Sequence, residues 1–276
     1  MTRDTPPRAG RIVFLGGLHR SGTSLLFRCL RAHPEISGFA DTGVPEDEGQ
    51  HLQTVYLPAR AHGGPGRFGF DPAAYLDERS KLVTEENRER LFGDWAPHWD
   101  RSRPLLLEKS PPNLIRSRFL QALFPQSSFI VLLRHPIVVS LATQKFSGTS
   151  VGSLLEHWVV CHERAAADWP HLARVRIVTY EELVARPGQV LRDLCGFLGV
   201  GPLEPPEPVD TAASDPYLRR WRRMRRSWRP LRSTLSRTVE ELEPRVRRFG
   251  YSLEEPELMT GIPVALQRYS SAAPPT

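Results

Sequence analysis

Residues 17–24, with the sequence Gly-Leu-His-Arg-Ser-Gly-Thr-Ser, have the composition of an anion-binding loop. Glycines at positions 17 and 22 form the G-x-x-x-x-G frame of a phosphate-binding loop. An apolar run precedes the loop and apolar residues at helical spacing follow it, so we expect backbone amides and a helix N-terminus to converge on one anion. The alternative is a tight turn that merely joins a strand to a helix. The predicted anion-binding residues are Arg20, Ser21, Gly22, Thr23 and Ser24.

The same loop lacks the lysine of a nucleoside-triphosphate enzyme. In those enzymes a lysine follows the second glycine and reaches the phosphates, beside a hydroxyl that binds Mg²⁺. Here Thr23 occupies that position, and the cation is Arg20, inside the loop. The apolar run 129–133 is followed by Arg134, where a metal site would need an acidic residue. The sequence therefore predicts no metal and disfavours a P-loop phosphotransferase, which stays an alternative together with a nucleotide-binding module without catalysis.

The elements around these residues alternate between strands and helices. Short apolar runs predict strands at 11–17, 105–107, 129–133 and 175–179, while apolar residues at helical spacing predict helices between them. The helices are expected at 24–32, 111–123, from 136 onward, at 154–169 and at 187–198. This order predicts an α/β fold, a P-loop-like parallel sheet with helices on both faces. Residues 37–73 are rich in Gly and Pro and are expected to form a long functional loop.

Four segments, in this order, resemble the motifs of the PAPS-dependent sulfotransferases. They are the loop 17–24, Glu-Lys-Ser-Pro-Pro-Asn at 108–113, the run 124–136, and Val-Thr-Tyr-Glu-Glu-Leu at 178–183. The resemblance covers about residues 11–200, with a weaker similarity over 217–251, and looks closer to the bacterial and tyrosylprotein-type enzymes than to the aryl and steroid enzymes. It implies PAPS (3′-phosphoadenosine-5′-phosphosulfate) as donor, a small-molecule or peptide acceptor, and adenosine 3′,5′-bisphosphate as product.

The resemblance also implies roles for individual residues. Arg20 and Lys109 would stabilise the sulfonate and the bridging oxygen as catalytic cations, although Lys109 could be an ordinary surface lysine. Arg134 follows a strand at the edge where ligands of parallel sheets bind, and would contact the 3′-phosphate. The family's next 3′-phosphate contact is a serine eight positions on, where this chain has Ala142. Ser140, or alternatively Thr143, is predicted to replace it.

Two further predictions concern the adenine and the base. Tyr180 would contact the adenine by resemblance, and the alternative is a tyrosine packed in the core. For the base that deprotonates the acceptor, the loop after the first helix offers Asp41, Glu46, Asp47, Glu48 and His51. Asp41 aligns with the catalytic glutamate of the tyrosylprotein-type enzymes and is the predicted base, with Glu46 or His51 as alternatives. A solvated acidic loop is the other interpretation.

The C-terminal third contains an arginine-rich segment. Eight arginines lie between 219 and 232, around apolar residues at helical spacing, and Pro230 is expected to bend or interrupt that helix. These arginines could face nucleic acid, an anionic membrane, the donor's phosphates or solvent. The resemblance favours a lid over the nucleotide, built from Arg219, Arg220 and Trp221. The domain prediction is a flexible tail at 1–10, one sulfotransferase domain at 11–252 with a helical lid region at 217–251, and a flexible tail at 253–276.

Composition sets limits on these interpretations. The 276 residues are 40% hydrophobic and 25% charged, as in a folded globular protein. Only three of the 37 basic residues are lysines, a bias that a GC-rich bacterial genome would produce. Three scattered cysteines suggest neither disulfides nor a zinc site, and no apolar stretch is long enough for a spanning helix, so we expect a cytoplasmic protein without membrane insertion or a nucleic-acid partner. The sequence defines neither the acceptor nor the oligomeric state.

Overall fold

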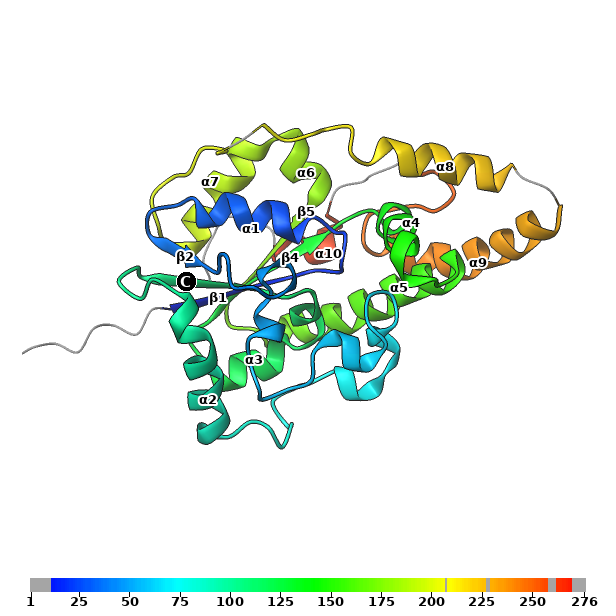
Figure 1. Cartoon of the computed structure of the whole chain (residues 1–276). Helices are drawn as coiled ribbons and strands as arrows, with labels where there is room; N and C mark the ends of the chain where they lie inside the picture. Colours follow the sequence, from blue (N-terminus) through cyan, green and yellow to red (C-terminus); the bar gives the residue numbers. More distant parts are fainter. Residues whose placement is uncertain (1–10, 207, 227–228, 258–261, 270–276) are drawn as a thin grey trace, which may run out of the picture.

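A five-stranded parallel sheet forms the centre of the molecule (Figure 1). The computed structural model describes residues 11–206, 208–226, 229–257 and 262–269. The strand order is β2-β3-β1-β4-β5, and every pair is parallel. The strands are β1 (Arg11–Gly16), β2 (Ile36–Gly38), β3 (Leu105–Lys109), β4 (Ser128–Leu133) and β5 (Val175–Thr179). The predicted α/β fold is confirmed, and so are the four predicted strands.

Helices cover both faces of the sheet. In Figure 1, α1 (Thr23–Arg31), α6 (Tyr180–Ala185) and α7 (Pro187–Leu198) lie above the strands, and α2 (Glu85–Trp95), α3 (Ser117–Leu123) and α5 (Val151–Asp168) lie below them. The remaining helices are α4 (Pro136–Ser147), α8 (Asp215–Arg225), α9 (Arg229–Arg247) and α10 (Val264–Gln267). Short 3₁₀ helices occur at Pro45–Asp47, Gly49–His51, Ala59–His62, Phe68–Phe70, Pro72–Ala74, Ala96–His98, Pro111–Ile115 and Trp169–His171.

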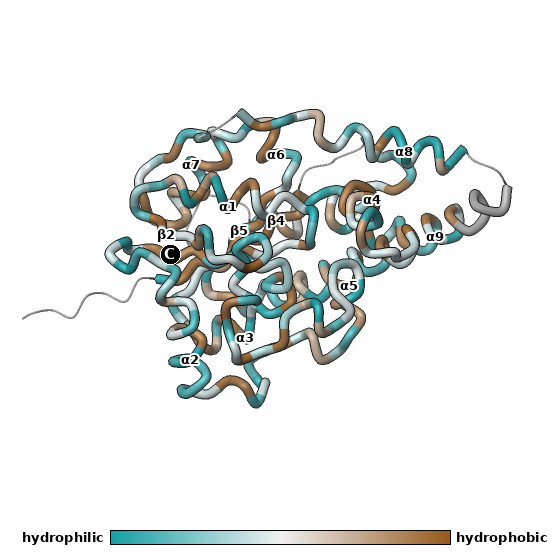
Figure 2. Tube along the Cα trace, viewed as in Figure 1, coloured by the Kyte–Doolittle hydropathy of each residue, from teal (hydrophilic) through white to brown (hydrophobic). Residues whose placement is uncertain are grey.

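The core lies between the sheet and its two helical layers. Strands β3 and β4 are buried along their whole length, and Figure 2 shows hydrophobic residues concentrated on the strands while α2 and α8 are largely hydrophilic. Phe14 of β1 stacks on Phe129 of β4 with ring centroids 5.5 Å apart. Burial on both faces explains why the strands read as continuous apolar runs.

Several elements were not predicted, among them strand β2 and the helices α2, α6 and α10. Strand β2 has only three residues, Ile-Ser-Gly, which is too short for an apolar pattern. Helix α2 is mostly polar and buries only Leu91 and Trp95, so its apolar period is weak. Its N-terminus is nevertheless capped, because the Thr84 hydroxyl accepts a hydrogen bond from the Asn87 amide.

Two features of the C-terminal region differ from what the sequence suggested. The sequence predicted a bend or interruption at Pro230, but α8 ends at Arg225 and Pro230 is the second residue of α9, where its missing N–H is not needed. Within the predicted tail at 253–276, Leu253 is fully buried and the Ile177 amide of β5 donates to the Tyr269 carbonyl at 2.9 Å, so parts of this range pack on the domain. Residues 1–10 and 270–276 lie outside the described part.

Candidate active site

The phosphate-type loop lies between the end of β1 and the start of α1. Gly22 is the N-cap of α1, with a φ of 101° that favours glycine, and Arg20 also has a positive φ of 69°. No side chain caps the helix, and the first-turn amides have no carbonyl acceptor within it. The Ser21 amide turns back to the Leu18 carbonyl at 3.0 Å. The loop therefore presents backbone donors at a helix N-terminus, as an anion requires.

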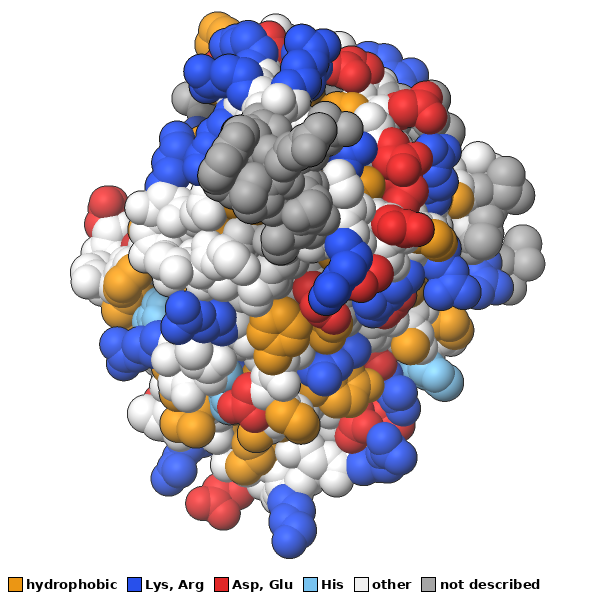
Figure 3. All heavy atoms as spheres, turned by 90° about the vertical axis from the view of Figure 1, so that its right-hand side faces the viewer, with side chains coloured by type: hydrophobic (Ala, Val, Ile, Leu, Met, Phe, Trp, Pro, Cys, Tyr) orange, Lys and Arg blue, Asp and Glu red, His pale blue; other side chains and the backbone are white. Residues whose placement is uncertain are grey.

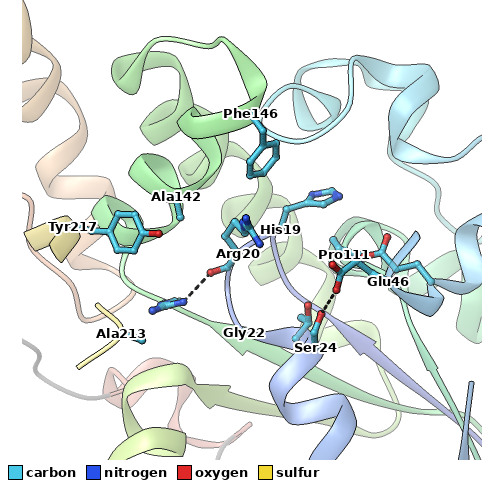
Figure 4. A pocket seen from close by; sticks show the side chains of 13 residues that line it. His19, Arg20, Gly22, Ser24, Glu46, Pro111, Ala142, Phe146, Ala213 and Tyr217 are labelled. Carbon is cyan, nitrogen blue, oxygen red and sulfur yellow. Dashed lines mark hydrogen bonds between the residues drawn. The ribbon is translucent and has the colours of Figure 1, made fainter. Parts of the chain in front are cut away.

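A cavity of about 580 Å³ opens beside this loop. This volume is in the range of ligand-binding pockets. Arg20 points into the middle of the cavity (Figure 4), with its guanidinium 5.0 Å from the centre of the Phe146 ring. Ala142 and Tyr217 lie on one side of Arg20, and Ser24, Glu46 and Pro111 lie on the other.

Arg134 is a second cation at the cavity and is held by several contacts. Its Nη1 donates to the Arg20 carbonyl at 3.1 Å and its Nη2 to the Ser214 hydroxyl at 2.9 Å. Its guanidinium lies 3.7 Å from the centre of the Tyr180 ring, and burial lowers the pKa of Arg134. Within the described residues, its Nε has no hydrogen-bond partner. Arg134 thus brings a partly desolvated, preoriented charge to the cavity wall.

The Tyr180 ring packs against both the phosphate-type loop and Arg134. A Cβ added at Gly22 would lie 2.5 Å from Tyr180 Cδ2, so the ring packs directly on the loop as well as on Arg134. Tyr180 is buried, and the residues that line the cavity do not include it. The structure therefore places it between the loop and the second cation.

Lys109 lies at the end of β3 and is buried, which excludes the ordinary surface lysine. Its Nζ donates to the Glu46 carbonyl at 2.7 Å and lies 3.4 Å from Glu48 Oε1. Lys109 is not one of the residues that line the cavity. Its ammonium thus lies behind the acidic segment 46–48, in contrast to the exposed cation Arg20.

The three predicted base residues have different positions. Asp41 is exposed, has a φ of 52° and is not part of the cavity lining. Glu46 lines the cavity, and its carboxylate accepts a hydrogen bond from the Ser24 hydroxyl at 3.0 Å. His51 is half-buried, with Nε2 3.9 Å from Glu48 Oε2. The structure brings Glu46 to the phosphate-type loop and leaves Asp41 in solvent.

Ser140 and Thr143 do not reach the cavity. Ala142 of α4 lines it, whereas Ser140 and Thr143 border a separate cavity of about 10 Å³ near His157. Ser140 precedes Ala142 by two residues, which is about 200° around a helix. Neither hydroxyl residue is therefore among those that line the larger cavity, and the replacement of the family's serine stays a prediction.

Two cavity-lining residues have surroundings that the sequence did not predict. His19 is half-buried, the burial of its ring lowers its pKa to about 3, and its Nδ1 has no partner among the described residues. Glu48 is buried, and burial raises the pKa of its carboxyl while the nearby Lys109 opposes that rise. Glu48 lies in the acidic loop, and its spacing does not distinguish it from the neighbouring carboxylates. His19 lies within the phosphate-type loop, where no sequence pattern predicts burial.

Helix α8 provides the remaining wall. Tyr217 lines the cavity, and its hydroxyl accepts a hydrogen bond from Lys145 Nζ at 3.1 Å. Arg220 donates to Gln144 at 2.7 Å, and the buried Trp221 donates to the Leu253 carbonyl at 2.9 Å. The outward face of α8 is basic, and Lys and Arg side chains gather at the top of Figure 3, where α8 lies. This face carries Arg219, Arg222, Arg223 and Arg226.

Fold and site together define an anion-binding α/β protein with a P-loop-like sheet. Among the described residues, no group of three His, Cys, Asp or Glu side chains could hold a metal ion, and no helix is both long and apolar enough to cross a bilayer. The sulfotransferase family model matches residues 13–205. The chain therefore belongs to the sulfotransferase family.

Comparisons with individual proteins agree. The chain is 28% identical over 200 residues to protein-tyrosine sulfotransferase 2 of Gallus gallus, covering 68% of this chain and 51% of that protein. It is 26% identical over 229 residues to nodulation protein NoeE of Sinorhizobium fredii, covering 73% and 53%. It thus spans about half the length of these curated relatives. A sulfotransferase structure from Mycobacterium avium shares the fold, with a TM-score of 0.51, 15% identity, and coverage of 88% and 76%.

Proposed function

We propose that this chain transfers a sulfuryl group from PAPS to an acceptor hydroxyl or similar nucleophile and releases adenosine 3′,5′-bisphosphate. The observation that carries the proposal is the placement of Arg20 and Arg134 at one cavity beside a helix N-terminus. Family membership supports the choice of donor.

Buried donors at the site fit a ligand with two anionic groups. In the described part of the chain, neither the Ser21 hydroxyl nor Arg134 Nε has a hydrogen-bond partner, and both are buried. Buried donors of this kind cost free energy unless an acceptor satisfies them. We assign the 5′-phosphosulfate to the loop with Arg20 and the 3′-phosphate to Arg134, because two separated cations match the two phosphate positions of the donor. The assignment of the adenine to Tyr180 stays a prediction.

The reaction needs little covalent work from the protein. The acceptor oxygen attacks sulfur in line, and the bond between sulfur and the bridging oxygen breaks, leaving the electron pair on the 5′-phosphate. Arg20 and Lys109 would stabilise the charge that develops on this leaving group. For Lys109 this requires its ammonium to exchange the Glu46 carbonyl or Glu48 for the phosphate oxygen. A carboxylate of the acidic loop would take the acceptor's proton.

Ligand-induced stabilisation tests the proposal most directly. We expect adenosine 3′,5′-bisphosphate to raise the melting temperature without Mg²⁺, and to do so more than AMP or ATP, because a ligand that binds only the folded state stabilises it. Scanning fluorimetry with each nucleotide, with and without Mg²⁺, gives the comparison. Stabilisation by ATP with Mg²⁺ alone would contradict the proposal.

The acceptor has to be found by experiment. Residues 37–73 contribute Glu46 and Glu48 to the cavity lining, and α5 contributes Leu154 and His157 to a smaller cavity that His19 also borders. Both segments are proposed to contribute to the acceptor pocket, for small molecules or for a peptide. Incubation with PAPS and a panel of hydroxylated acceptors, followed by mass spectrometry, would detect the mass gain of one sulfuryl group. The lid role of Arg219, Arg220 and Trp221 is likewise a proposal, supported by the contact of α8 with the cavity through Tyr217.

We also propose a bacterial, cytoplasmic enzyme. The three cysteines are buried and form no disulfide, which is compatible with a reducing compartment. Fractionation of the source cells with an antibody against the chain would test this location.

A further inference from the structure

Two carboxylates, Glu46 and Glu48, line the cavity, and their environments differ. Glu46 is exposed, whereas Glu48 is only 6% exposed. Removal from water disfavours the charged form of a carboxyl group. A buried carboxylate therefore has a higher affinity for a proton than an exposed one. Burial accordingly raises the pKa of Glu48 above its ordinary value.

The contacts of Glu48 orient its carboxylate. Oε2 accepts a hydrogen bond from Gln50 Nε2 at 2.5 Å, and Oε1 lies 3.4 Å from Lys109 Nζ. His51 is 3.9 Å from Oε2. The Glu48 carboxylate is therefore held between the Gln50 side-chain amide and the Lys109 ammonium. Lys109 is also the cation proposed to stabilise the leaving phosphate.

The backbone around Glu48 is fixed by groups far away in the sequence. The backbone amide of Gln50 donates to the Ser110 hydroxyl at 2.9 Å, and that hydroxyl donates to the Glu108 carboxylate at 2.6 Å. Trp95 Nε1 donates to the Gly49 carbonyl at 2.9 Å. Gly49 itself packs on Glu108, since an added Cβ would lie 2.4 Å from Glu108 Oε1. Such support gives the positional precision that a catalytic group needs.

We propose that Glu48 is the general base of sulfuryl transfer in this protein, an inference that rests on the function proposed above. The acceptor hydroxyl gives its proton to the Glu48 carboxylate while its oxygen forms the new bond to sulfur. The bond from sulfur to the bridging oxygen breaks, and its electron pair stays on the 5′-phosphate. The proton then passes from Glu48 to water, so that every atom and charge is accounted for.

The other candidate bases are less suited by their surroundings. His19 lines the cavity, but burial lowers its pKa to about 3, which makes it a weak proton acceptor. Glu46 already accepts a hydrogen bond from Ser24 and is exposed to water. Asp41 is exposed and outside the lining. Of these groups, Glu48 alone combines burial, access to the cavity and a fixed backbone.

The decisive pair of variants is Glu48→Gln and Glu46→Gln, the same chemical change two residues apart. We expect Glu48→Gln to lower turnover by ~10²–10⁴-fold and Glu46→Gln to lower it much less, because general-base catalysis contributes an effect of that size. Turnover is read as adenosine bisphosphate release from PAPS, with the acceptor found by mass spectrometry, or with water as acceptor if none is found. Calorimetric binding of the bisphosphate should change little in either variant.

A second measurement separates a base from a merely structural residue. With phenolic acceptors that the wild-type enzyme uses, Glu48→Gln should lose less turnover as the acceptor becomes more acidic, because an acidic hydroxyl needs less help to release its proton. If Glu48→Gln does not fold, Glu48→Asp keeps the charge and retracts the carboxylate, and it should lose turnover while retaining bisphosphate affinity.

The outcomes are distinguishable. If the wild-type chain neither binds the bisphosphate nor consumes PAPS, the proposed function fails. If the wild-type chain is active and Glu48→Gln turns over like Glu46→Gln, only the assignment of the base fails. Equal loss for all phenols, unchanged turnover in Glu48→Asp, or loss of bisphosphate binding in a folded Glu48→Gln would likewise overturn the assignment.

Discussion

The phosphate-type loop at 17–24 and the acidic segment at 41–51 border the same cavity but acquire their shapes differently. The loop is shaped mainly by its own residues, through Gly22 at a φ of 101° and the hydrogen bond from the Ser21 amide to the Leu18 carbonyl. The acidic segment depends on partners that are distant in the chain, such as Ser110 and Trp95. A locally determined site can be inferred from a motif, whereas a site determined by tertiary contacts needs the fold.

After the loss expected for Glu48→Gln, the largest effect should come from Arg20, the cation of the locally determined loop. Arg20→Ala should lower turnover by ~10²–10³-fold, because a preoriented donor at the developing charge contributes about that much. Steady-state kinetics with PAPS would measure it, with Arg90→Ala on the exposed side of α2 as control. If Arg20→Ala matched the control, the loop would bind the donor without stabilising the transition state.

The second cation should act on affinity and should distinguish between nucleotides. Arg134→Ala should weaken adenosine 3′,5′-bisphosphate by ~1.5–3 kcal/mol, the cost of losing a hydrogen bond to a charged group. AMP, which lacks the 3′-phosphate, should lose much less. Isothermal titration calorimetry with both ligands measures the difference. Equal losses would mean that Arg134 stabilises the cavity through the Arg20 carbonyl and is not the 3′-phosphate contact.

The packing of the acidic segment can be broken with one methyl group. Gly49→Ala should destabilise the fold by ~1–3 kcal/mol, because the added carbon would overlap the buried Glu108 carboxylate. Gly93→Ala in α2 is the matched control, since nothing lies within 4 Å of its added carbon, and it should be neutral or stabilising by up to ~1 kcal/mol. Urea unfolding of both variants gives the free energies. Equal stabilities would show that the segment can shift without cost.

The smallest effect is expected at the residue that the sequence favoured as base. Asp41→Asn should change turnover by less than about threefold, since exposed substitutions usually alter free energies by no more than ~0.5 kcal/mol. The same assay as for Glu48→Gln applies. A loss of several orders of magnitude would restore Asp41 as the base and would require the turn at 41–47 to close over the cavity.

Sequence reasoning was strongest where the chain determines its own structure. The strands β1, β3, β4 and β5 were predicted because buried parallel strands are continuous apolar runs, and the loop was predicted from its glycine spacing. The position of Arg134 at the cavity followed from the rule that ligands bind at the carboxyl ends of parallel strands.

The same reasoning was weakest where burial is imposed from outside. The cavity positions of Glu48 and His19 are not encoded nearby, since Glu48 depends on β3 and Trp95, and the His19 ring packs edge-on against Phe68 with centroids 5.8 Å apart. Ser140 was favoured for its hydroxyl, but the register of α4 decides which side chain faces the cavity, and that register places Ala142 there. The burial of Glu48 and His19 and the orientation of α4 depend on contacts between distant parts of the chain, which the spacing of residues in the sequence does not predict.

The hydrogen bond from the Ile177 amide to the Tyr269 carbonyl protects part of the edge of the sheet from pairing with another molecule. Strand β5 is an outer strand of the sheet, and outer strands expose backbone groups that can pair with a strand of another molecule. The segment around Tyr269 occupies part of this edge and so blocks such pairing. A chain cut short before Ile262 would keep its cavity-lining residues but would expose the edge of β5 to intermolecular strand addition, and we expect such a chain to self-associate at concentrations where the full chain does not.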